Sequence, residues 1–397
     1  MLNKKKITPL LLIILSLSAL ASNTIAPLTT IIAKELNVNI NLVVLLITIY
    51  FFGNSIGQIL SGNLSDIKGR KKVLIVGIII FILSSVSISV LHNIYIIIIL
   101  SFIQGIGGGV LVTIYKSTIF DIHKGEKAQK IFSYLSSLYA LINIAAPFIG
   151  IFINDAFGWR YIYILLSLVS LITLISIIFL FPKIKNSGDN SVSFFIKAKK
   201  MIQNLNFLFY SLIVLISYSL ILFMITILPI LFKNLDFMNN DFLPYSYAGM
   251  ILFYMIGNLF SVKYVAKPNK AINISLYLLI ILLITLSTSI CLKNEVALYL
   301  SLAISNIFSG ILLPLYSGLA IQIYPKEKGL ASSINGAIQI GGGALLISIM
   351  AIIINFNLYT YLGFVFCLIP IIIYIKKRII TKVTVAQVSK KVKNLPF

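Results

Sequence analysis

Long runs of apolar residues, each about twenty residues long, alternate with short polar segments along the whole chain. A run of that length crosses a bilayer as an α-helix, whereas a transmembrane strand needs about ten residues. The pattern therefore predicts an all-α membrane protein. We place twelve spans at residues 7–32, 42–61, 73–92, 94–120, 131–153, 159–181, 206–232, 246–263, 271–291, 296–323, 330–354 and 358–375.

The composition supports a membrane protein and excludes several classes of soluble protein. The 397 residues are 59% hydrophobic and 11% charged, whereas soluble domains have about 45–50% apolar and about 25% charged residues. A water-soluble enzyme, a disordered regulator and a secreted disulfide scaffold are therefore excluded. The formal net charge of +22 would suggest a nucleic-acid partner in a soluble protein. Here the basic residues fill the gaps between apolar runs, so we expect no nucleic acid.

The distribution of basic residues predicts the orientation of the spans. If the N-terminus is cytoplasmic, 28 of the 32 Lys and Arg residues lie on the cytoplasmic side or at the inner end of a span, while the ten acidic residues divide equally. Such a bias toward cytoplasmic Lys and Arg is typical of membrane proteins. We therefore expect both termini to be cytoplasmic. The Ile-, Lys- and Asn-rich composition suggests a bacterial inner membrane.

The N-terminus also has features of a cleaved signal peptide. Lys4–Lys6 precede an apolar run that contains Ala19-Leu20-Ala21, a possible cleavage site. However, the uncharged run continues to Ala33, which is too long for a signal peptide, and cleavage would leave eleven spans. We therefore prefer an uncleaved first span.

A polar segment divides the spans into two sets of six. Gly62-Asn63-Leu64 and Gly257-Asn258-Leu259 lie at similar places in the two sets, which favours a duplication around a central cavity. We predict an N-terminal six-helix bundle over 1–181, a cytoplasmic linker over 182–205, a C-terminal six-helix bundle over 206–375 and a basic cytoplasmic tail over 376–397.

A charged segment with two glycines follows the second span and reads Gly62-Asn63-Leu64-Ser65-Asp66-Ile67-Lys68-Gly69-Arg70-Lys71-Lys72. It resembles the signature loop of the major facilitator superfamily, G-x-L-x-D-R-x-G-R-K-x. The resemblance implies the major facilitator fold, twelve transmembrane helices in two six-helix bundles. The family's Arg after the Asp is Ile67 in this chain.

The residue types in this segment are suited to a cytoplasmic gate. Gly62 permits close helix approach, and Gly69 permits a tight turn. We expect Asp66 to face the positive N-terminus of a neighbouring helix, which we assign to the eleventh span, and Arg70 to pair with Asp121. The predicted gate residues are Gly62, Asp66, Gly69, Arg70, Lys71 and Asp121. The alternative is a solvated charged segment that only fixes topology.

Further motifs resemble those of one branch of this superfamily. Ala146, Pro147 and Gly150 in the fifth span are similar to the antiporter motif of drug exporters. Gly158-Trp159-Arg160 precedes the sixth span, and Gly329-Leu330-Ala331-Ser332-Ser333 opens the eleventh. Together these segments resemble the Bcr/CflA-type multidrug exporters, a branch of drug:proton antiporters. The resemblance implies export of drug-like or amphipathic small molecules with protons as the coupling ion.

Two family charges associated with proton coupling are replaced in this chain. Asn23 stands where the family has an acidic residue in the first span, and Ser101 stands where it has a membrane Arg in the fourth. An ionisable group inside a bilayer usually marks function. The sequence therefore does not identify the residue that would carry a proton.

Amides and tyrosines inside the spans are the candidates that remain for a substrate cavity. Such groups must find hydrogen-bond partners, so we expect them to face the bundle interior. The leading candidates for a substrate cavity are Asn23, Gln104, Asn143, Tyr218, Asn306 and Gln339. For each residue the alternative is a hydrogen bond between helices without substrate contact.

We expect neither cofactor nor metal. The two histidines and the two cysteines are too few for a metal site, and the glycines 107–109 lack the Gly-Lys-Ser/Thr of a phosphate loop. We predict a secondary transporter that works by alternating access, acts as a monomer in the lipid bilayer and is not an enzyme. A metabolite symporter or facilitator is the alternative. A lipid enzyme lacks the required polar cluster, and a sensor lacks a signalling domain.

Overall fold

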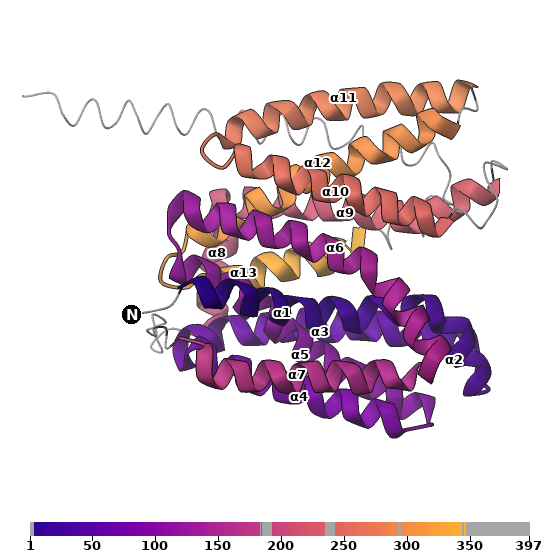
Figure 1. Ribbon diagram of the computed structural model, residues 1–397. Coiled ribbons are helices and arrows are strands. Elements are labelled where there is room, and N and C mark those ends of the chain that lie inside the picture. The colour runs from indigo at the N-terminus through magenta and orange to yellow at the C-terminus, as the bar shows by residue number, and fades with distance from the viewer. Residues whose placement is uncertain are drawn as a thin grey trace, which may run out of the picture.

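The computed structural model describes residues 4–182, 184, 193–234, 243–292, 295–343 and 345–346. Every regular element within these ranges is helical (Figure 1). The all-α prediction is therefore confirmed for the described part of the chain. The predicted twelfth span, the end of the predicted eleventh and the basic tail lie outside the described residues.

The first helix group precedes the linker and begins with a broken helix. Its elements are α1 (Lys4–Asn23), η1 (Ala26–Leu28), α2 (Thr29–Glu35), α3 (Ile40–Lys68), α4 (Arg70–Val90), α5 (Ile94–Ile122), α6 (Gly125–Phe157) and α7 (Arg160–Leu180). The predicted first span is interrupted by the 3-10 turn η1, which contains Pro27. A proline in the first turn suits this break because its missing N–H needs no partner there.

The second helix group follows a short amphipathic helix in the linker, α8 (Phe194–Gln203). Its elements are α9 (Leu205–Asn234), α10 (Leu243–Lys263), α11 (Pro268–Leu292), α12 (Glu295–Gln322), α13 (Lys328–Ala337) and the π-helical segment η3 (Ile338–Gly342). The linker was expected to be polar, but Met201 of α8 is buried with Phe207, Leu330 and Ile334. The linker helix therefore packs on the second group.

Eight helices among the described residues are long and apolar enough to cross a membrane. They correspond to the first seven predicted spans and to the tenth. Two shorter apolar helices, Ala248–Lys263 and Leu276–Thr285, fall within the predicted eighth and ninth spans. The chain is thus a multi-pass membrane protein.

Local residues explain several helix ends. The side chains of Asn39 and Asn93 accept backbone N–H bonds at the starts of α3 and α5, as N-cap residues commonly do. Gly69 has φ +94° between α3 and α4, and Gly158 has φ +95° before α7. Side chains with a Cβ rarely adopt this conformation, so glycine permits both sharp turns.

The signature segment after the second span is helical rather than a loop. We expected a loop from Gly62 onward, but α3 continues to Lys68 and only Gly69 forms the turn. A transmembrane helix does not need to end where its apolar run ends, because polar side chains are tolerated once it leaves the hydrocarbon region. The extra turns bring α3 to the N-terminus of α13, where Gly329 and Leu330 lie.

The two helix groups show an internal repeat in a different register from the expected one. A Cβ on Gly105 would meet the backbone of Tyr50 and Asn54, and a Cβ on Gly310 would meet that of Tyr254 and Asn258. The structural counterpart of Gly257-Asn258 is therefore Gly53-Asn54, and the proposed match with Gly62-Asn63 is wrong. The repeated pattern is Tyr-x-x-Gly-Asn, at 50–54 and 254–258.

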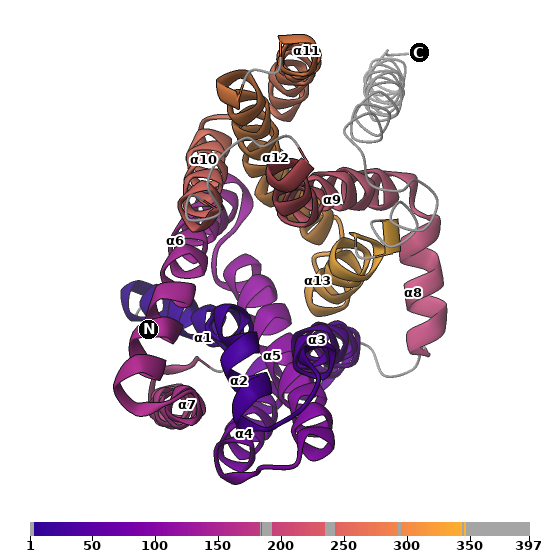
Figure 2. The same ribbon diagram turned by 90° about the vertical axis from the view of Figure 1, so that its right-hand side faces the viewer.

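The two groups meet along two helix pairs. Figure 2 shows α13 beside α3 and α6 beside α10, and contacts join both pairs. Each group also has its own buried apolar cluster, one formed almost entirely by residues 7–181 and the other by residues 209–316. Polar contacts between the groups lie where α3, α5 and α6 meet α12, α13 and η3.

Candidate functional site

The carboxylate of Asp66 binds the N-terminus of α13. Its Oδ1 accepts the backbone N–H of Gly329 at 3.0 Å, and its Oδ2 accepts that of Leu330 at 2.8 Å. The first N–H groups of a helix have no partner within the helix, and the helix dipole favours an anion there. One side chain of the first group thus caps a helix of the second group, which is the contact expected for Asp66.

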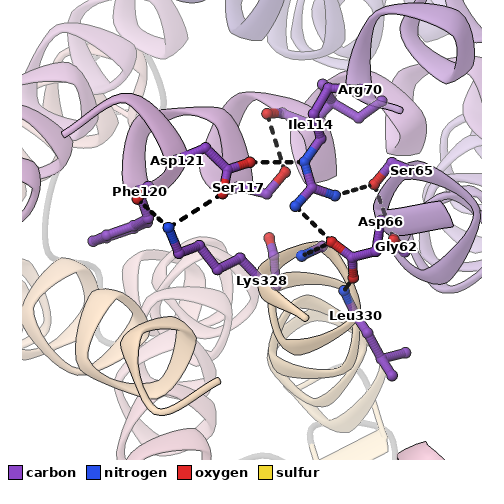
Figure 3. Close-up of polar contacts among 12 residues, drawn as sticks. Gly62, Ser65, Asp66, Arg70, Ile114, Ser117, Phe120, Asp121, Lys328 and Leu330 are labelled. Atoms are coloured by element: carbon purple, nitrogen blue, oxygen red, sulfur yellow. Dashed lines mark hydrogen bonds and ion pairs between the residues drawn. The ribbon is translucent and has the colours of Figure 1, made fainter. Parts of the chain in front are cut away.

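Arg70 lies between two carboxylates of the first group (Figure 3). Its Nε is 2.9 Å from Asp121 Oδ2, its Nη2 is 2.5 Å from Asp66 Oδ1, and its Nη1 donates to Ser65. The guanidinium is 3% exposed. A buried cation is favourable only when its donors are satisfied, and here three guanidinium nitrogens have partners. The expected pairing of Arg70 with Asp121 is present.

Lys328 completes this charge cluster from the second group. Its Nζ lies 3.2 Å from Asp121 Oδ1 and also donates to the carbonyl of Phe120. We refer to Asp66, Arg70, Asp121 and Lys328 as the gate cluster. Lys328 was missed in the sequence analysis, where it served only as evidence of topology. Its position at the start of α13, beside the predicted partner of Asp66, was the available signal.

Glycines allow α3 and α13 to approach closely at the gate cluster. A Cβ on Gly62 would overlap Ser333 and come within 2.7 Å of the carbonyl of Gly329. A Cβ on Gly329 would in turn overlap Arg70. Close contact between these helices therefore requires glycine at both positions.

Lys71 does not join the two groups. Its Nζ donates to the carbonyl of Ile178 at 2.6 Å, near the end of α7. A lysine at this place satisfies a helix C-terminal carbonyl and interacts favourably with the helix dipole. Lys71 thus holds α4 to α7 within the first group.

A second layer of polar contacts lies deeper between the groups. Lys116 of α5 donates to Gln339 Oε1 at 3.3 Å, and Ser332 donates to the carbonyl of Thr113 at 3.4 Å. Gln339 belongs to the π-helical segment η3. Such segments are rare and frequently occur at functional sites. The side chain of Lys116 is buried, with 9% exposure.

Gln129 makes a third contact between the groups. Its Nε2 donates to the carbonyl of Pro314 at 2.8 Å, and its Oε1 accepts from Gln322 at 3.2 Å. Pro314 lies inside α12. Gln129 could not be selected from the sequence, because a single amide near a helix start carries no recognisable pattern.

The cavity candidates fall into two sets. Asn23, Asn143, Tyr218 and Gln339 are partly exposed, whereas Gln104 and Asn306 are buried. Asn23 donates to Asn143 Oδ1 at 2.8 Å, which joins α1 to α6. Gln104 donates to Ser85 at 2.8 Å and Asn306 to the carbonyl of Leu302 at 2.9 Å, both within their own group. These last two amides fit the alternative of structural hydrogen bonding.

The antiporter-like residues lie where α6 packs on α1. Ala146 and Gly150 are buried, and a Cβ on Gly150 would overlap the carbonyl of Thr24. Pro147 lies inside α6 and has no N–H to donate to the carbonyl of Asn143, four residues earlier. The motif therefore combines close packing against α1 with a weakened point in the helix.

A separate ion pair joins α2 and α7 at the opposite end of the first group. Glu35 binds Arg160 and also accepts from Trp159 Nε1 at 2.8 Å. The Arg160 guanidinium lies 4.4 Å from the centre of the Trp159 ring. Among the residues that the structure describes, no group of three or more His, Cys, Asp or Glu side chains could hold a metal ion.

Comparisons with known proteins identify related chains. The family model described as Major Facilitator Superfamily matches residues 11–346. A bicyclomycin resistance protein homolog of Haemophilus influenzae is 28% identical over 152 residues, which span 38% of each chain. The multidrug resistance protein MdtL of Citrobacter koseri is 25% identical over 334 residues, which span 82% of this chain and 83% of that protein.

Solved structures share the fold at low sequence identity. The structure of FucP in an outward conformation gives a TM-score of 0.75 at 15% identity and covers 93% of this chain and 97% of that one. FucP is described as the E. coli fucose:proton symporter. At this identity the match concerns the fold alone.

Proposed function

The chain belongs to the major facilitator superfamily, and from this premise we propose that it is a secondary active transporter that exports amphipathic, drug-like molecules in exchange for protons. The observation that carries the proposal is the gate cluster. Asp66 binds Gly329 and Leu330, which follow it in the sequence by 263 and 264 positions. These contacts hold the two helix groups together, and water can replace them. A closure of this kind is what alternating access requires on one side of the molecule.

The gate cluster lies at the ends of helices that we assign to the cytoplasmic side. The neighbouring Lys68, Lys72 and Lys124 agree with a cytoplasmic position under the positive-inside bias. We infer that this structure corresponds to the outward-facing state, closed toward the cytoplasm.

The drug-export part of the proposal is supported by two observations. Relatives with the names bicyclomycin resistance protein homolog and MdtL share sequence with this chain. Gly150 of the antiporter-like motif packs against the backbone of Thr24, next to the Asn23–Asn143 hydrogen bond, and both of these amides are partly exposed. Amides and tyrosine rings suit neutral or cationic amphipathic compounds.

We extend the proposal to the whole chain as twelve transmembrane helices in a bacterial inner membrane. The bundles comprise residues 1–181 and 206–375, joined by the linker over 182–205, and both termini are cytoplasmic. The transporter acts as a monomer on a small-molecule substrate and is not an enzyme.

Ethidium uptake into inverted membrane vesicles that contain this protein tests the proposal. We expect uptake that follows an imposed pH gradient and stops when an uncoupler is added. Vesicles without the protein are the control. If folded protein gives no gradient-driven uptake, ethidium export by proton antiport is wrong, and a metabolite substrate becomes the better hypothesis.

A further inference from the structure

We propose that Lys116 is the residue that carries the exchanged proton. The inference rests on the proposed function and supplies the group that the sequence did not reveal, because Asn23 and Ser101 replace the family's charges. Of the described residues other than tyrosines, Lys116 is the one ionisable side chain that is buried in a spanning helix more than one turn from its end.

Lys116 has an amide but no carboxylate as its partner. Its Nζ donates to Gln339 Oε1, and no carboxylate of the described residues lies within ion-pair distance. Beyond Glu327 the chain contains neither Asp nor Glu. An ammonium buried with a single neutral acceptor is strongly unfavourable. Either the proton leaves or an anion joins the site.

The side chain extends away from the gate cluster. Lys116 lies five residues before Asp121, about 7.5 Å along the helix axis. Helical side chains point toward their own N-terminus, and the partner Gln339 lies about two turns beyond Ser332, which contacts Thr113. The ammonium therefore lies between the gate cluster and the partly exposed residues of the interior.

The partner of Lys116 is not fully enclosed. Gln339 is partly exposed, as are Asn23, Asn143 and Tyr218. With the gate cluster closed, we expect water to reach Gln339 from the side opposite the cluster. When α13 separates from α3 and α5, the same group would meet cytoplasmic water. Lys116 would thus be accessible from the outer side and from the cytoplasmic side in turn.

The charged groups on the surrounding helices are engaged elsewhere. Asp66 on α3, Arg70 on α4, Asp121 on α5 and Lys328 on α13 bind one another in the gate cluster. Tyr50 and Tyr139 belong to the apolar cluster of the first group or pack against it, and Tyr218 packs against that of the second. A tyrosine hydroxyl ordinarily loses its proton only near pH 10. α1 and α12 bring no described charged side chain to this layer.

Lysine suits proton exchange because, unlike arginine, it can lose its proton on burial. The step is Lys–NH3+ giving Lys–NH2 and a proton, which passes to water on the side to which the site is open. A cationic substrate in the adjoining interior repels the ammonium and favours release of the proton. A proton also needs no cavity beside Lys116, whereas an organic anion does.

Four forms of the protein test this role in parallel. They are wild type, Lys116→Met, Lys116→Arg and the control Lys130→Met, which removes an exposed lysine of α6. The first measurement is proton release into weakly buffered detergent solution when ethidium is added. The second is ethidium uptake by vesicles with and without a pH gradient. Thermal melting checks that each variant is folded.

We expect wild type and Lys130→Met to release protons and to accumulate ethidium with the gradient. Both Lys116 variants should lose proton release and gradient-driven accumulation, while Lys116→Met keeps downhill ethidium flux. Proton release and accumulation by folded Lys116→Met would overturn the inference alone. A wild type without either signal would overturn the proposed function, and the inference with it. Stabilisation of wild type but not Lys116→Met by carboxyfluorescein would identify an anion site instead.

Discussion

Charge balance at the gate cluster explains why it joins the two helix groups. Asp66, Arg70 and Asp121 of the first group carry one excess negative charge. Lys328 supplies the missing positive charge from the second group, and the N-terminus of α13 adds a partial positive charge. The closed arrangement is therefore electrically neutral, and each carboxylate has a partner from its own group and one from the other.

Substitution of Arg70 should destabilise the protein strongly. Arg70→Gln leaves Asp66 and Asp121 close together with only Lys328 as a charged partner, and removal of one partner from a buried ion pair costs about 3–5 kcal/mol. We expect a marked fall in melting temperature of the purified protein in detergent. Lys72→Gln, at an exposed neighbouring position, should melt like wild type. An unchanged melting temperature for Arg70→Gln would contradict the buried ion pair.

A methyl group at Gly62 should prevent full closure. Gly62→Ala places a Cβ against Ser333 and the backbone of Gly329. Because both neighbours belong to a helix turn, the strain is relieved most easily by separation of α3 and α13. We expect faster hydrogen exchange at the start of α13 and slower ethidium transport. Gly341→Ala, which meets no described atom within 4 Å, is the matched control, and equal exchange in both variants would argue against close packing.

Individual site residues were predictable where a motif fixes their neighbours. Asp66 and Arg70 occupy set positions in the signature, so their partners could be anticipated at a helix N-terminus and at Asp121. Lys328 could have been chosen from its place beside the predicted partner of Asp66. Gln129 could not be predicted, because its partners depend on the rotation of a helix that is distant in sequence. The same uncertainty explains Gln104, whose amide points toward Ser85 of α4.

At the scale of helices, the apolar runs predicted where the helices occur better than how long the helices are. The described spans lie close to their expected positions, but α3 extends through the signature segment to Lys68 and the first span breaks at η1. Hydropathy records which residues suit hydrocarbon, and it is insensitive to helical turns outside the membrane. The repeat register was also wrong, since a three-residue match at Gly62 was preferred to the structural counterpart at Gly53, nine residues earlier.

Pro147 should tune the flexibility of α6. Pro147→Ala restores an N–H that can bond to the carbonyl of Asn143 and stiffens the helix beside α1. We expect an unchanged or slightly higher melting temperature together with slower ethidium transport. Pro9→Ala, at an exposed position near the start of α1, should leave transport unchanged. Unaltered transport in Pro147→Ala would show that the missing hydrogen bond in α6 is not needed.

At the scale of the molecule, separation of the two helix groups should be necessary for transport. Thr113 and Ser332 contact each other across the interface. A Thr113→Cys and Ser332→Cys pair, in a background without Cys291 and Cys367, should cross-link under oxidation and stop ethidium transport until a reductant is added. Cysteines at Ser85 and Gln104, which lie within the first group, should leave transport intact. Transport by the cross-linked protein would exclude opening at this interface.

The position of Arg70 has a consequence for the energy of opening. When α13 withdraws, Arg70 stays with Asp66 and Asp121 because all three belong to the first helix group. Neither carboxylate is then left in isolation, and water can replace the two backbone hydrogen bonds and the contact with Lys328. Each such replacement costs roughly 0.5–3 kcal/mol. The closed and open arrangements can therefore differ by only a few kcal/mol, so that both are populated and a gradient or a bound molecule can decide between them.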